Sequence, residues 1–168
     1  MSLLLSMSYK VENLPNHLPK YELLVISIAT PLLVGVYRDK VLIETVSSEK
    51  KTSEILLPLL STYMERYNLS SIIYTRGPGS YMAIKLTYIT LKTIEITRGI
   101  ECLGCSAFAV NNGAPIKAMG NLYFTKEKET IITKKIEQPV NASFTLPQSI
   151  QDLPLDEEST PEYVIPAV

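Results

Sequence analysis

The residues best suited to chemistry lie in a glycine–proline turn, Arg76-Gly77-Pro78-Gly79-Ser80, directly after the apolar run at 72–74. Two glycines around a proline allow a sharp turn with outward-facing N–H groups, and Ser80 is a good N-cap for a following helix. Such a strand, turn and helix N-terminus can bind a phosphate group. The segment fits neither the dinucleotide-binding fingerprint nor the P-loop, however, so a stiff turn is the favoured interpretation.

Cys102 and Cys105 are the next residues that could react. Their Cys-x-x-Cys spacing occurs in redox and zinc sites, but the sequence has no second cysteine pair, and its only histidine, His17, lies far upstream. We therefore expect two buried thiols in a reducing compartment. Because no serine–histidine–acid set or metal-ligand spacing occurs either, we predict no catalytic, cofactor-binding or metal-binding residues.

Composition limits the function further. With 168 residues, of which 46% are hydrophobic, the chain can bury the core of one domain or of two small ones. Its 16 basic and 17 acidic residues leave no basic excess with which to hold nucleic acid alone. No signal peptide and no run long enough to span a membrane is evident, so we expect a cytoplasmic protein.

Apolar and β-branched runs predict three strands near the N-terminus, at 23–28, 32–37 and 41–46. The first run is almost wholly apolar, which is typical of a strand covered on both faces. A polar hairpin turn at 38–40 joins the second and third strands. A further strand at 72–74 leads into the glycine–proline turn.

Two long helices should position that turn. The first is expected to begin at Thr52 or Ser53 and to run to Tyr67, with apolar residues at helical spacing. The second is favoured from Ser80 to about residue 97, because no Gly or Pro interrupts this stretch, and Gly99 is a suitable stop.

The C-terminal part begins with a predicted strand at 101–105 and a short helix capped by Ser106. Strands at 119–124 and 129–134 are then expected to pair. Residues 136–168 contain no Lys or Arg and five of the 11 prolines, so we expect an extended or mobile segment. The predicted division is an N-terminal extension, a first domain and a shortened second domain, at 1–20, 21–111 and 112–168.

Residues 75–81, Thr-Arg-Gly-Pro-Gly-Ser-Tyr, resemble the Gly-Arg-Gly-Pro-Gly-Ser-Phe signature of the TsaB (YeaZ) family, a bacterial partner in the threonylcarbamoyladenosine modification of tRNA. Three further segments are similar to that family: Leu56-Leu57-Pro58, Met119-Gly120-Asn121-Leu122-Tyr123-Phe124 and Pro161-Glu162-Tyr163-Val164. The resemblance covers residues 23–168.

This resemblance implies an α/β fold of the actin-like ATPase (ribonuclease H-like) superfamily, with a central mixed sheet flanked by helices and a reduced second domain. It also implies a non-catalytic subunit that binds the catalytic TsaD-like subunit, with a TsaE-like ATPase as a further partner. In such a complex tRNA is contacted only through the assembly, and a homodimer is the other implied assembly. No cofactor and no membrane contact is expected.

The sequence departs from the family at three places. Ser27 stands where the family has an aspartate, and Thr52 stands where it has a histidine. Ile116-Lys117-Ala118 replaces Asp-Ala-Arg. Serine cannot carry the charge with which an actin-like ATPase coordinates magnesium or positions water. A small actin-like enzyme, either an ATPase or a glycoprotease-type peptidase, remains the alternative.

A subunit without chemistry acts through a surface, and the two predicted helices carry more large apolar side chains than one buried stripe uses. The predicted partner interface comprises Tyr63, Met64, Tyr67, Tyr81, Met82 and Ile89. Within the signature loop, Arg76 is expected to be dispensable for folding, and its loss is expected to act on partner binding or to have no effect.

Overall fold

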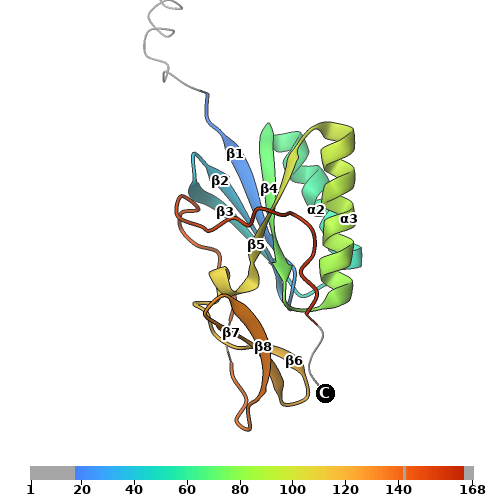
Figure 1. Ribbon diagram of the computed structural model, residues 1–168. Coiled ribbons are helices and arrows are strands. Elements are labelled where there is room, and N and C mark those ends of the chain that lie inside the picture. The colour runs from blue at the N-terminus through green and yellow to red at the C-terminus, as the bar shows by residue number, and fades with distance from the viewer. Residues whose placement is uncertain (1–17, 142, 165–168) are drawn as a thin grey trace, which may run out of the picture.

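A computed structural model describes residues 18–141 and 143–164, so His17 and most of the predicted N-terminal extension lie outside the described residues. The elements in chain order are β1 (Tyr21–Ile26), β2 (Leu32–Arg38), β3 (Val41–Ser48), α2 (Thr52–Arg66), β4 (Leu69–Gly77), α3 (Tyr81–Arg98), β5 (Glu101–Ser106), the 3-10 helix η1 (Ala107–Val110), β6 (Ile116–Met119), β7 (Leu122–Glu127) and β8 (Thr130–Lys135). Figure 1 shows α2 and α3 together on one side of a sheet.

The first sheet has five strands in the order β3-β2-β1-β4-β5. The three N-terminal strands form the predicted antiparallel meander, and Asp39 and Lys40 make its turn with positive φ. On its other side β1 pairs in parallel with β4, which pairs in parallel with β5. The apolar strand β1 is therefore central, and Leu23, Leu24 and Val25 are fully buried.

Helices α2 and α3 cover one face of this sheet. Leu56 and Leu60 of α2 and Ile84 and Leu91 of α3 are buried in the core. The stretch that forms α3 is rich in β-branched residues, yet it is a helix, as predicted. The threonine hydroxyls on its exposed side donate to the carbonyl groups four residues earlier, as Thr93 does to Ile89, so they do not compete for other backbone groups.

The C-terminal segment covers the opposite face. Leu146 packs against Gly35, where an added Cβ would lie 3.2 Å from its Cδ2 atom. The Tyr37 hydroxyl donates to the Pro147 carbonyl at 2.7 Å, and the Ile150 N–H donates to the Lys40 carbonyl. This segment is extended, as predicted. Its Ile150 belongs to the core, and Phe144, Leu146 and Leu153 pack against the core, so the segment covers the sheet as a second layer of helices would.

A second, three-stranded antiparallel sheet has the order β6-β7-β8 and lies at the end of the first sheet (Figure 1). The strand predicted at 119–124 is wrong, because Gly120, with φ +57, makes a turn there that separates β6 from β7. The predicted pairing with the following strand is confirmed. The division of the chain into domains stays a prediction.

We expect Ile150→Ala to lower the free energy of unfolding by about 2–5 kcal/mol, because the C-terminal segment buries this side chain in the core. Leu155→Ala, at an exposed position of the same segment, should change it by no more than about 0.5 kcal/mol. Urea denaturation measures both. Equal, small effects would contradict the assignment of this segment to the core.

Candidate functional site

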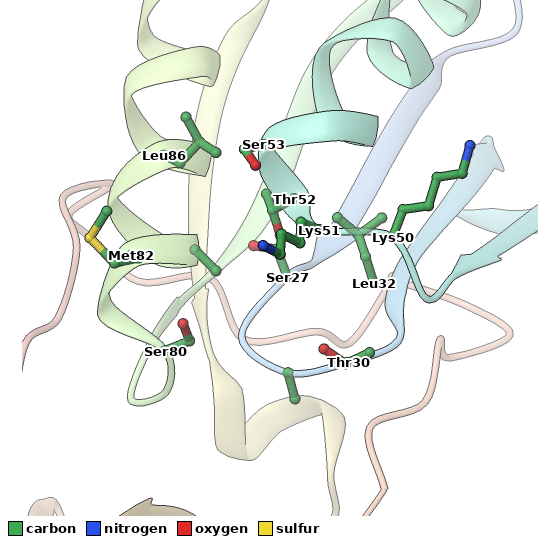
Figure 2. Close-up of a pocket in the computed structure, with 12 residues that line it drawn as sticks. Ser27, Thr30, Leu32, Lys50, Lys51, Thr52, Ser53, Ser80, Met82 and Leu86 are labelled. Carbon is green, nitrogen blue, oxygen red and sulfur yellow. The ribbon is translucent and has the colours of Figure 1, made fainter.

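The carboxyl end of β1, the first turn of α2 and the β4–α3 turn surround one pocket of about 480 Å³. Figure 2 shows its lining, with Ser27 at the end of β1, Thr52 and Ser53 starting α2, and Ser80 and Met82 at the start of α3. Such a position outside the carboxyl ends of parallel strands is where α/β proteins commonly bind ligands. Much of the lining here is apolar, contributed by Ala29, Leu32, Met82, Ala83 and Leu86.

Ser27 does not supply the chemistry that an actin-like ATPase needs at this pocket. Its Oγ lies 2.7 Å from the Oγ1 of Thr87 on α3, and both residues are buried. This hydroxyl is therefore already engaged in a neutral hydrogen bond, and magnesium prefers charged carboxylate oxygens. Figure 2 also shows the Lys50 side chain directed away from Ser27. The residues that line the pocket include no carboxylate that could hold the magnesium ion of a nucleotide.

The two glycines of the signature turn serve different purposes. Gly77 has a φ of +137°, which side chains with a Cβ rarely adopt, and an added Cβ would lie 2.4 Å from the Glu162 carbonyl oxygen. Gly79 has an ordinary φ, but an added Cβ would lie 2.7 Å from the Cβ of Ile28. The turn therefore packs against the loop after β1 on one side and against the C-terminal segment on the other. Ser80 occupies the N-cap position of α3 without a side-chain capping bond.

Arg76 is turned into the protein. It is 8% exposed, its Nη1 lies 2.6 Å from the Asp156 carboxylate, and its Nε donates to the Thr160 carbonyl at 2.5 Å. Burial raises the pKa of the nearby Glu162 carboxyl group, although the Arg76 charge opposes that shift. These contacts contradict the expectation that Arg76 acts only on a partner, because its charge is used within the chain.

The residues of the predicted interface separate into two groups. Tyr63 is 2% exposed and belongs to the core, so its assignment to the interface is wrong. Met64 and Tyr67 are half-buried, and the Tyr67 hydroxyl donates to Glu44. Tyr81, Met82 and Ile89, in contrast, lie on the surface of α3.

Met82 and Ile89 form one line along α3 together with Ile96, which is not among the residues of the predicted interface. Their side chains are 77%, 51% and 79% exposed. Because the three residues are seven apart, they lie on one side of the helix. That spacing is visible in the sequence and could have identified Ile96. We call Met82, Ile89 and Ile96 the α3 line.

The cysteines are buried in β5, as predicted. Successive residues of a strand point to opposite faces, so Cys102 and Cys105, three apart, point away from each other. Both are free thiols, and burial raises the pKa of Cys102 to about 11 and that of Cys105 to about 12. The Cys-x-x-Cys spacing therefore does not produce a redox pair.

Comparison with known proteins identifies the fold. No family model matches the sequence, and no curated protein matches it. The solved structures that resemble the chain include an uncharacterized protein with similarity to peptidase YeaZ from Pseudomonas aeruginosa, with 11% identity and a TM-score of 0.56 over 72% of this chain and 69% of that one. They also include YeaZ from Pseudomonas aeruginosa, with 12% identity and a TM-score of 0.54 over 70% of this chain and 65% of that one. The chain thus spans about two thirds of each, and the predicted actin-like α/β fold is confirmed.

We expect Gly77→Ala to destabilise the protein by about 2–5 kcal/mol, from backbone strain and from displacement of the C-terminal segment. Gly99→Ala is the control, because Gly99 also has a positive φ, +70°, but no atom within 4 Å of an added Cβ. It should cost about 1–2 kcal/mol. Equal losses in thermal or urea unfolding would show that contact with Glu162 contributes nothing.

Neither cysteine of the folded protein should react with a thiol reagent at pH 8, because the raised pKa values keep both thiols protonated. Both should react at once in denaturant. Since unfolded thiols ionise at lower pH than native ones, stability should fall as the pH rises above about 8.5. Rapid labelling of the native protein would contradict the assigned burial.

Proposed function

We propose that this chain is a TsaB-like, non-catalytic subunit that binds an actin-like catalytic subunit of the TsaD kind in the complex that makes threonylcarbamoyladenosine in tRNA. The observation that carries the proposal is the α3 line, an exposed apolar row on a YeaZ-like fold. Exposure of three large apolar side chains to water is unfavourable in an isolated chain. A partner helix can bury them and remove that cost.

The surroundings of the α3 line favour a helix as its partner. The helix that carries it is 18 residues long, and an exposed row at intervals of seven is the pattern that packs against a second helix. Leu57, on the neighbouring helix α2, is also an exposed apolar residue. Both a TsaD-like subunit and a second copy of this chain could supply such a helix, and the first is the proposed partner.

A catalytic role has less support. The buried hydrogen bond between Ser27 and Thr87 occupies the position of the carboxylate that an actin-like ATPase uses. Within residues 18–141 and 143–164, no group of three or more His, Cys, Asp or Glu side chains is placed to hold a metal ion. We therefore do not favour the ATPase or peptidase alternative.

Contact with tRNA is proposed only through the complex. The chain has a formal net charge of −1, and binding of the nucleic acid backbone requires a basic surface. A TsaE-like ATPase would be the further partner that supplies nucleotide hydrolysis. No helix in the described part of the chain is long and apolar enough to cross a membrane.

Met82→Glu and Ile89→Glu should leave the fold intact and weaken binding to the TsaD-like subunit of the same organism at least about tenfold, the effect of losing roughly 1.4 kcal/mol at an interface. Met119→Glu is the control, since Met119 is an exposed methionine on β6. Calorimetry and sedimentation measure heterodimer and self-association separately. Unchanged binding in both helix variants would refute this interface.

The isolated chain should not bind ATP in a magnesium-dependent manner, because Ser27 offers no charged ligand and is engaged by Thr87. Isothermal calorimetry with and without magnesium provides the measurement. Micromolar, magnesium-dependent binding that is lost in Gly79→Val would instead favour the enzyme alternative.

A further inference from the structure

Residues 156–164, which we call the latch segment, are held against the first sheet without being a strand of it. The Asp156 N–H donates to the Gly104 carbonyl of β5 at 2.8 Å, and the Glu162 N–H donates to the Arg76 carbonyl of β4 at 2.9 Å. The Tyr74 hydroxyl donates to the Ser159 carbonyl between these two points. With so few backbone bonds, the docking of this segment depends on side chains.

Arg76 is the main electrostatic anchor of the latch segment. Its guanidinium contacts the Asp156 carboxylate at 2.6 Å, and the carboxylates of Glu158 and Glu162 lie 3.8 and 3.9 Å away. Three carboxylates therefore share one guanidinium, and Lys126 is the second cation that lines the pocket formed here. Because so much of the attraction passes through one side chain, changing Arg76 or its closest carboxylate should release the segment.

The sheet is shaped to receive both the anchor and the segment. An added Cβ on Gly104 would lie 2.2 Å from the Cδ of Arg76, and one on Gly77 would lie 2.4 Å from the Glu162 carbonyl oxygen. Arg76 can lie across β5 only because Gly104 has no side chain. Gly77 of the signature turn likewise leaves room for the Glu162 carbonyl group of the latch segment.

The far end of the latch segment lies on α3. The rings of Tyr163 and Tyr81 meet edge to face with centroids 5.3 Å apart, and the Tyr81 hydroxyl donates to the Val164 carbonyl. Tyr81 is the first residue of α3 and directly precedes Met82, where the α3 line begins. The segment thus contacts Tyr81, in the first turn of the helix on which the proposed interface lies, and leaves Met82 77% exposed.

We propose that the latch segment is an autoinhibitory strap, which in its closed state competes with the partner for Tyr81 in the first turn of α3. Release from Arg76 frees Tyr81 and opens that end of the helix. The apparent affinity for the partner is the affinity of the open state multiplied by the fraction of molecules that are open, so closure of the latch segment weakens binding. The identity of the competitor rests on the proposed function, whereas the latch itself does not.

The latch can be tested in the full-length chain by hydrogen exchange and by hydroxyl-radical labelling of Tyr81. In Asp156→Asn and Arg76→Gln, the Glu162 amide should exchange about tenfold faster than in the wild type, which corresponds to about 1.4 kcal/mol. Labelling of Tyr81 should rise together with this exchange. Glu157→Gln is the matched control, an acidic residue of the same segment without an ion pair to Arg76.

Exchange at Leu24, in the core, checks that each variant is folded, and Asp156→Asn alone decides the matter if Arg76→Gln does not fold. Wild-type exchange at Glu162 and wild-type labelling of Tyr81 in Asp156→Asn would overturn the latch.

Competition is tested by titrating the TsaD-like subunit into the wild type, Asp156→Asn and Glu157→Gln. Asp156→Asn should bind severalfold more tightly than the other two chains, because a larger fraction of it is open. Equal affinities of the wild type and Asp156→Asn would overturn autoinhibition. If none of the three chains binds, the proposed function fails and the competition with it, while the exchange measurements still decide the latch.

Discussion

The need to keep β1 out of water on both faces is the constraint on which the rest of this structure depends. Leu23, Leu24 and Val25 expose nothing to solvent, and a strand of this kind is stable only between two apolar layers. Helices α2 and α3 form one layer. On the opposite face, within the described residues, the cover is an extended chain that carries Leu146 and Ile150 into the core.

A cover without its own ladder of backbone hydrogen bonds must be fixed by other means. In this chain the fixing groups come from the sheet: the Tyr37 hydroxyl near the start of the C-terminal segment and Arg76 near its end. The signature turn therefore has a structural task in addition to joining β4 to α3. Because the same segment also contacts Tyr81, the proposed latch links the cover of the sheet to access to α3 through one continuous stretch of chain.

The order of strands and helices could be predicted from sequence because periodicity and turn residues are local signals. The docking of the C-terminal segment on the sheet could not be predicted from sequence, because the close contacts at Gly77 and Gly104 involve residues far apart in the chain. The acidic, proline-rich composition of residues 136–168, without Lys or Arg, favoured an extended or mobile segment. That composition does not indicate that Arg76, on a distant strand, supplies a positive charge to the segment. Tyr63 was assigned to the surface because helical spacing alone does not tell which of two apolar rows faces the core.

The most direct test of the central claim is hydrogen exchange of this chain alone and mixed with the TsaD-like subunit of the same organism. We expect a stable complex in which amides of α3 around Met82, Ile89 and Ile96 become protected, while those of the second sheet do not change. Protection confined to the second sheet, or the absence of a complex at micromolar concentrations of both proteins, would contradict the claim that this chain acts as a partner subunit through α3.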